Sequence, residues 1–270
     1  MAATHMNPAI AIKNLSFSYG RHAVLQDISL EIPEKQFTIL LGKNGSGKST
    51  LLRLIAGLLD PSAGRVSVLG KDLGGLRIAE RARLLGFLAQ HHTSVFPFTV
   101  EDVVLTGRAA HVAFIPKAAD RDKAEQAIDT IGIGHLRGRA FTELSGGEQQ
   151  LVMIARVLAQ APRVILLDEP TSSLDIFNQA RFLGMVREFL GMGLTVLAVL
   201  HDPNMAFLYG DNFVFLKDRR LFTPDPGQSP WDAAVLEQVY NARLEAIPHH
   251  GRALIVPQRE TPLQGGDPQA

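Results

Sequence analysis

A glycine-rich segment that ends in lysine and serine has the clearest chemistry in this chain. It follows the apolar run Phe37–Leu41 and precedes a helix expected from Ser49 to Leu59, where apolar residues recur at helical spacing. Successive backbone N–H groups of such a loop can turn toward one anion, and the helix start near Lys48 adds the positive end of its dipole. This pattern predicts that Lys48 reaches the β- and γ-phosphates of a nucleotide and that the Ser49 hydroxyl is a ligand of Mg²⁺. The residues predicted to bind the phosphates are Gly42, Lys43, Asn44, Gly45, Ser46, Gly47, Lys48, Ser49 and Thr50.

Two acidic residues follow a second apolar run. Asp168 ends the run Val164–Leu167, and Glu169 and Pro170 come directly after it. We predict that the Asp168 carboxylate emerges at the edge of the sheet that faces the phosphates, where it holds Mg²⁺ through water. A turn before a helix would use the same residue types, so this prediction depends on their occurrence together with the glycine-rich loop.

Three further motifs accompany these two in a fixed order: Gln90, the segment Leu144-Ser145-Gly146-Gly147-Glu148-Gln149, and His201. In identity, order and separation the five motifs resemble those of ABC transporter ATPases, and the resemblance extends from about Ile10 to about Pro257. It implies ATP hydrolysis with ATP and Mg²⁺ as cofactors. It also implies an α/β fold with a P-loop NTPase (RecA-like) core, an N-terminal antiparallel β subdomain and an inserted α-helical subdomain.

The resemblance assigns roles within the site. It implies that Glu169 is the catalytic base that polarises the attacking water, that Gln90 approaches Mg²⁺ and this water, and that His201 hydrogen-bonds the γ-phosphate. Together with Lys48, these three residues form the predicted catalytic set. Tyr19 resembles the aromatic residue that stacks on adenine. Two alternatives stay open, because a strand aromatic is more often part of the core and a solitary histidine at a strand end is more often structural.

The segment Ser145-Gly146-Gly147-Glu148 also fits the Ser-x-x-Glu capping box that begins a helix, and an apolar-rich helix is expected from Gln149 to Gln160. A cap does not need two successive glycines, whereas small residues at a helix N-terminus allow close approach of a phosphate. In ABC ATPases this segment contacts the γ-phosphate bound by a second cassette, and the loop that resembles Ser173-Leu174-Asp175 contacts the other cassette. Since every motif needed for both half-sites is intact, we expect a head-to-tail homodimer; pairing with a different ATPase chain is the alternative.

Composition restricts the classes of function. The chain has 270 residues, with 27 basic residues, 27 acidic residues and no cysteine. The balanced charge gives no reason to expect a nucleic-acid partner, and the lack of cysteine excludes disulfides and fits a cytosolic compartment. Its apolar runs are far shorter than the roughly 20 residues of a membrane-spanning helix. The sequence therefore predicts a soluble chain whose membrane role comes through a partner.

Short apolar strands alternate with helical stretches, which is typical of an α/β sheet with crossover helices. Between Gln90 and about Pro162, apolar residues recur at helical spacing instead. The predicted units are an ATP-binding α/β core at residues 9–90 and 163–224, a helical signature subdomain at 91–162 and a C-terminal extension at 225–257. Residues 1–8 are expected to be a flexible N-terminus or a tag remnant, and residues 258–270 a disordered tail.

Three segments resemble a narrower group, the importers for iron–siderophore complexes, haem, cobalamin and molybdate. They are Phe96–Arg108, Leu236–Tyr240 and Ala253–Pro257. The resemblance implies transmembrane permease subunits as partners, indirectly a solute-binding protein, and a peripheral position on the cytoplasmic face of the inner membrane. An apolar rim at Phe96-Pro97-Phe98 suits a groove that receives a helix of the permease, although these side chains could also pack inside the helical lobe.

The direction of transport and the cargo depend on resemblance alone. An ABC exporter ATPase is one alternative, and a soluble ABC ATPase outside transport is another. The second class usually has paired cassettes, a long coiled coil or a basic surface, which this chain lacks. Among cargoes, an iron–siderophore complex stands first, and haem, cobalamin and molybdate remain open.

Overall fold

The computed structural model describes residues 8–90, 97–172, 174–249 and 252–258. Of the two ends predicted to be flexible or disordered, residues 1–8 and 258–270, all but residues 8 and 258 lie outside the described residues, as do Phe96 and Ser173. Among the described residues, no helix is long and apolar enough to span a bilayer.

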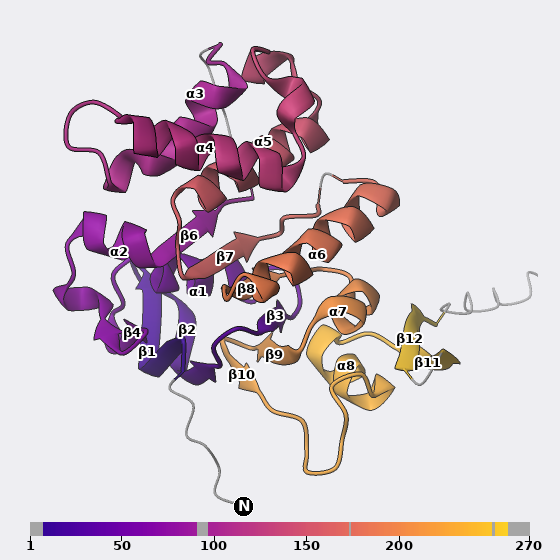
Figure 1. The fold of residues 1–270 in the computed structure, drawn as a ribbon. Coiled ribbons are helices and arrows are strands. Elements are labelled where there is room, and N and C mark those ends of the chain that lie inside the picture. The colour runs from indigo at the N-terminus through magenta and orange to yellow at the C-terminus, as the bar shows by residue number, and fades with distance from the viewer. Residues whose placement is uncertain (1–7, 91–96, 173, 250–251, 259–270) are drawn as a thin grey trace, which may run out of the picture.

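A six-stranded sheet forms the centre of the molecule, in the order β10-β9-β3-β8-β7-β6 (Figure 1). All neighbours are parallel except β10, which pairs antiparallel with β9. Strands β3, β7 and β8 are buried along their whole length, as expected for parallel strands covered on both faces. The bounds are β3 Phe37–Leu41, β6 Leu85–Leu88, β7 Val164–Asp168, β8 Thr195–Val199, β9 Asn212–Lys217 and β10 Arg220–Phe222.

Alternation along these strands divides the core between two layers. In β7, Val164 and Leu166 face one hydrophobic cluster and Ile165 and Leu167 face the other. The first cluster also contains α1 (Lys48–Ile55) and an antiparallel sheet in the order β2-β1-β4-β5. Those strands are β1 Ile10–Tyr19, β2 His22–Ile32, β4 Ala63–Val68 and β5 Lys71–Asp72. The α/β class with an antiparallel sheet beside a parallel one is thus confirmed.

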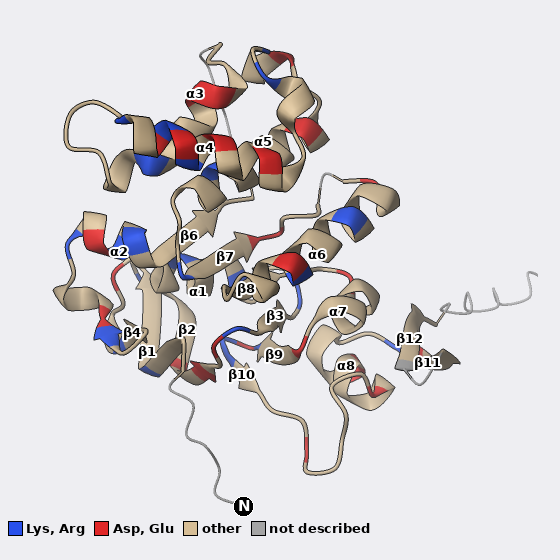
Figure 2. Cartoon of the chain, viewed as in Figure 1, with Lys and Arg blue, Asp and Glu red and all other residues tan. Residues whose placement is uncertain are grey.

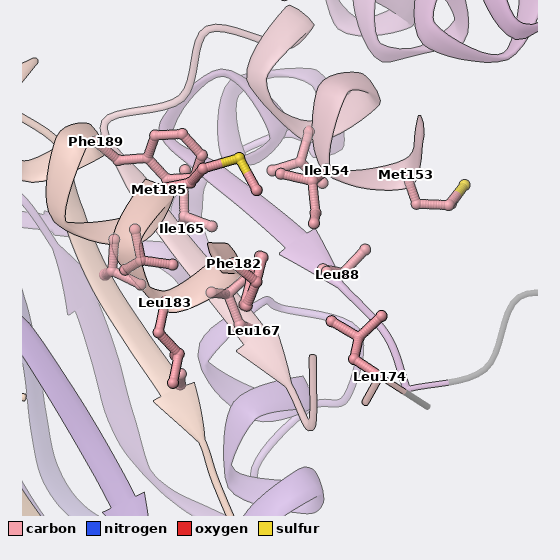
Figure 3. Close-up of a cluster of buried hydrophobic side chains, with 14 of the residues drawn as sticks. Leu88, Met153, Ile154, Ile165, Leu167, Leu174, Phe182, Leu183, Met185 and Phe189 are labelled. Carbon is pink, nitrogen blue, oxygen red and sulfur yellow. The ribbon is translucent and has the colours of Figure 1, made fainter. Parts of the chain in front are cut away.

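The part of the chain between β6 and β7 is helical in its described residues and forms the upper lobe of Figure 1. Its α-helices are α3 (Val100–Leu105), α4 (Ala118–Ile131) and α5 (Gly146–Ala159), after the earlier α2 (Ile78–Leu84). The lobe packs on α6 (Ile176–Gly191), and Figure 3 shows side chains of α5 and α6 in one apolar cluster with those of β7. Figure 2 shows both signs of charge on α2 and α4.

The C-terminal segment joins a helix to a small hairpin and packs on α7 (Pro203–Tyr209), which precedes β9. It comprises α8 (Ala233–Tyr240), β11 (Leu244–His249) and β12 (Arg252–Pro257). The side chain of Asn204 bonds both backbone groups of Ile255, donating to its carbonyl at 3.0 Å and accepting from its N–H at 2.7 Å. The hairpin is therefore joined to the helix that follows His201. The division into a core, a helical subdomain and an extension remains a prediction.

Two sequence expectations about helices need adjustment. The helix expected from Ser49 to Leu59 ends at Ile55, because Gly57 takes a left-handed φ of 68° that an α-helix cannot continue. The helix expected from Gln149 to Gln160 begins at Gly146, three residues earlier, because Ser145 caps it.

The first prediction concerns the close approach of the Gly107 backbone to the α5 backbone inside the helical lobe. A Cβ at Gly107 would lie 2.1 Å from the carbonyl oxygen of Arg156 in α5, whereas a Cβ at Gly184 in α6 would meet nothing within 4 Å. Gly107→Ala should lower the free energy of unfolding by about 1–3 kcal/mol, because the α5 backbone must shift. Gly184→Ala should raise it by about 0.5–1 kcal/mol, because alanine favours the helix. Urea denaturation measures both, and equal effects would contradict the packing described here.

Candidate functional site

The glycine-rich loop connects β3 to α1 and lines an open pocket. Gly47 caps α1 with a left-handed φ of 104°, and the helix begins at Lys48. Residues from four other parts of the chain complete the pocket, so the fold gathers most of the predicted site. The lining residues are Tyr19, Val24, Asn44, Gly45, Gly47, Lys48, Ser49, Thr50, Gln90, Glu169 and His201.

The Lys48 side chain is buried beneath the loop. Its Nζ donates to the carbonyl oxygens of Gly42 at 2.7 Å and Lys43 at 3.0 Å. Burial lowers the pKa of Lys48, and the carboxylates of Glu169 and Asp168 oppose this shift. The ammonium group thus holds the loop closed on itself and lies among the groups predicted to contact phosphates.

The Asp168 carboxylate is 1% exposed and only half paired. Its Oδ1 accepts a hydrogen bond from Ser49 Oγ at 2.8 Å, and its buried Oδ2 has no partner among the described residues. Burial raises the pKa of Asp168, and the Ser49 hydrogen bond works against the rise. A hard cation such as Mg²⁺ beside Oδ2 would satisfy this oxygen, and hydroxyl and carboxylate oxygens are suitable ligands.

The protein would supply only part of such a coordination sphere. No group of three or more His, Cys, Asp or Glu able to hold a metal occurs among the described residues. Mg²⁺ typically keeps several waters and takes substrate phosphates as ligands, with one or two carboxylates from the protein. Ser49 and Asp168 fit that pattern, and the predicted third ligand, Gln90, is directed to Glu169 instead.

Glu169 lies between Gln90 and His201. Its Oε2 accepts from His201 Nε2 at 2.7 Å and also from the Gln90 amide. The strand order explains this arrangement, because β7 lies between β6 and β8 and the three residues follow the carboxyl ends of these strands. Glu169 takes a left-handed φ of 51°, which is uncommon outside glycine and turns its side chain out of the strand. The sequence indicated all three residues but not their mutual contact.

Tyr19 ends β1 at the rim of the same pocket. Its ring is 48% exposed and meets the ring of Phe17 edge-on, with centroids 4.8 Å apart. A core tyrosine would be covered, so the exposed face favours a stacking role over the core alternative. The adenine contact itself remains a proposal.

The ABC transporter family matches residues 25–172. The chain belongs to the ABC transporter family. Its hydrolysis of ATP is accordingly coupled to transport. It is 40% identical to "Hemin import ATP-binding protein HmuV" of Pseudomonas entomophila, over 91% of this chain and 98% of that protein.

Two further likenesses cover nearly the whole cassette. The chain is 35% identical to "Probable iron chelatin transport ATP-binding protein" of Helicobacter pylori (strain ATCC 700392 / 26695), over 91% of this chain and 98% of that protein. A solved inward-facing ABC transporter, described as of the metal-chelate type, matches with a TM-score of 0.81 and 30% identity. That match covers 94% of this chain and 99% of the other.

The signature segment of this ABC ATPase begins α5. Ser145 Oγ accepts from the Glu148 N–H at 3.3 Å, and Glu148 Oε2 accepts from the Ser145 N–H at 2.8 Å, which completes the capping box. The hydrogen bonds from Ser145 lower the pKa of Glu148. Neither residue, nor Gly146 or Gly147, lines the pocket at the glycine-rich loop. In a single copy, the signature segment and this loop are therefore separate.

Asp175 has a structural role in the described chain. Its side chain accepts from the Asn178 N–H at 2.8 Å and caps α6. Its predicted contact with a second cassette remains a proposal.

Gln150 is a residue that the sequence analysis missed. It is 7% exposed, and its amide donates to the Pro170 carbonyl at 3.0 Å, so it joins the signature helix to the turn after Glu169. The available signal was a polar residue among apolar neighbours in a helix. Such a residue is expected to have a specific partner when buried.

The second prediction concerns the Ser49–Asp168 contact. Ser49→Ala should raise the Mg²⁺ concentration for half-maximal ATP hydrolysis by about tenfold, because a ligand of the ion and a partner of Asp168 are lost together. Ser67→Ala removes a hydroxyl in β4, bonded to Ala11, and is the matched control. Magnesium titrations of ATPase activity measure the effect, and identical curves for both variants would refute this role.

Proposed function

We propose that this chain is the ATP-hydrolysing subunit of an importer and that two copies enclose two ATP molecules head to tail. One observation carries the proposal. The glycine-rich loop, Gln90, Glu169 and His201 surround one pocket, while the Ser145–Glu148 segment lies elsewhere in the same copy. A second copy in head-to-tail orientation would bring its own Ser145–Glu148 segment to this pocket, and reciprocally.

The residues of the pocket suit separate roles in ATP binding and hydrolysis. Backbone N–H groups of the loop and Lys48 would bind the phosphates, and Tyr19 would stack on adenine. Ser49 and Asp168 would hold Mg²⁺, which neutralises phosphate charge when bound. Glu169 would accept a proton of the attacking water, and because its described side-chain contacts with Gln90 and His201 both use Oε2, Oε1 would be the oxygen that accepts from that water.

ATP binding would then drive movement. Contacts between the γ-phosphate and the partner's signature segment exist only in the closed dimer, so ATP favours closure. Hydrolysis and phosphate release remove them. In our proposal, Gln150 transmits this change within one copy, since its side-chain amide on α5 donates to the Pro170 carbonyl in the turn beside Glu169.

The permease contact is proposed at the helical lobe. Phe98 is 53% exposed, and its neighbour Pro97 is exposed as well. Both residues follow Gln90 in the chain and precede α3. An exposed aromatic ring of this kind suits a groove for a helix of a membrane subunit. The chain would accordingly lie on the cytoplasmic face of the inner membrane, with a solute-binding protein acting on the opposite face of the permease.

The cargo we propose is an iron chelate, either an iron–siderophore complex or haem. The two relatives named for hemin and iron chelatin transport support this choice, as does the transporter of the metal-chelate type. No residue of the pocket distinguishes among cargoes.

Affinity purification from detergent-solubilised membranes of the native host tests the importer role, with mass spectrometry of the associated proteins. A polytopic permease together with a solute-binding protein is the expected result. Ribosomes, nucleic acid or soluble factors in place of a permease would refute the transport assignment and leave the ATPase site intact.

The next prediction separates binding from hydrolysis. Glu169→Gln should keep ATP binding, lower turnover by at least about 100-fold and accumulate closed dimer, because the base is lost while the phosphate contacts remain. Lys48→Ala should instead weaken binding by about tenfold or more, because a charged donor is removed. Fluorescent-nucleotide titration, phosphate release and size-exclusion chromatography with ATP distinguish the two variants. Unchanged turnover in Glu169→Gln would defeat the assignment of the base.

A further inference from the structure

Four buried polar atoms have no hydrogen-bond partner among the described residues: Thr38 Oγ1, Ser46 Oγ, Asp168 Oδ2 and the Tyr240 hydroxyl. A buried polar group without a partner costs free energy, so each case needs an explanation. Ser46 and Asp168 belong to the predicted phosphate and Mg²⁺ site. Tyr240 belongs to no nucleotide motif, since it ends α8 near the C-terminus of the chain.

The end of α8 nevertheless lines the same cavity as the glycine-rich loop. Lys43 and Asn44 of the loop share a cavity of about 510 Å³ with Val239 and Asn241, the two neighbours of Tyr240 in sequence. Burial raises the pKa of Tyr240, and the backbone of Gly42 lies close enough to oppose that rise. The hydroxyl is therefore beside the first residue of the loop without a completed hydrogen bond.

Gly42 is a sensitive point of the loop. A Cβ on Gly42 would lie 2.3 Å from the carbonyl oxygen of Leu216 in β9, so this residue is closely packed against the sheet. Its own carbonyl accepts the 2.7 Å hydrogen bond from Lys48 Nζ. Whatever fixes the Gly42 backbone therefore also fixes the position of the Lys48 ammonium group.

The C-terminal segment reaches a second loop of the pocket as well. The negative charge of Asp202, directly after His201, acts on the Tyr240 hydroxyl. Two residues further, Asn204 bonds β12 through both backbone groups of Ile255. One segment thus contacts the start of the phosphate loop and the chain that carries His201.

We propose that Tyr240 is a positioning residue for ATP binding, whose hydroxyl accepts a hydrogen bond from the Gly42 N–H when the loop binds the phosphates. It acts through Gly42 and Lys48 and does not touch the nucleotide. The unpaired hydroxyl is then a partner held ready for one conformation of the loop. This inference rests on the proposed role of the loop in binding ATP.

Tyr240→Phe in the full chain tests the proposal, because it removes one atom and keeps the ring. The Kd for a fluorescent ATP analogue and the KM for ATP should rise about fivefold, the loss expected for one hydrogen bond, with kcat within twofold of wild type. Without nucleotide, the midpoint of thermal unfolding should stay equal or rise, since the lost hydroxyl was unpaired. Tyr209→Phe, at the half-buried end of α7, is the matched control and should leave all four quantities unchanged.

Three outcomes would overturn the inference. They are an unchanged Kd and KM in Tyr240→Phe, the same losses in Tyr209→Phe, or a lower unfolding midpoint without nucleotide, which indicates a merely structural hydroxyl. The failure of the proposed function is a different result. In that case the wild-type chain itself does not bind the ATP analogue, and the positioning role falls with it.

Discussion

The order of the parallel strands is the constraint on which the pocket depends. Strand β7 lies between β6 and β8, and all three end at the same edge of the sheet. Glu169 therefore emerges with Gln90 on one side and His201 on the other, and both bond its carboxylate. The next strand, β3, leads into the glycine-rich loop. Site residues from four distant parts of the chain therefore meet at one edge of the sheet, each directly after its strand. Ligands in open α/β sheets bind at this edge, outside the carboxyl ends of the strands.

Burial in the centre of this sheet also sets the electrostatics. The layers that exclude water from β3, β7 and β8 leave Lys48 and Asp168 nearly covered, so each would be costly without a partner of opposite charge or a hydrogen bond. Burial opposes the charged form of both groups, and their proximity opposes that effect. A phosphate beside the buried Lys48 ammonium group and a divalent cation beside the buried Asp168 carboxylate would together offset the cost of burying these two charges. In the proposed function, the site would thus bind a metal–phosphate complex more strongly than either component.

Much of this could be predicted from the sequence, because the evidence was local. The apolar runs that form β3, β7 and β8, the glycine-rich loop and the capping box at Ser145 depend on neighbours within a few residues, and the fold class that they indicated is confirmed. The bonds of Gln90 and His201 to Glu169 could not be predicted, since they depend on the lateral order of strands, which alternation does not encode. The roles of Gln150 and Tyr240 could not be predicted for the same reason, because the groups that they face lie on other elements.

The joint between Asn204 and β12 has a consequence for divergence among related chains. Asn204 uses only the N–H and carbonyl of Ile255, groups that every residue except proline possesses. The identity of the side chain at position 255 is therefore irrelevant to these two hydrogen bonds, although not to the core it fills. Substitutions could accumulate through the hairpin while the joint persists, provided that an extended strand still reaches α7. At this point of the molecule, the two hydrogen bonds constrain the length and the backbone shape of the chain and leave the side chain unconstrained.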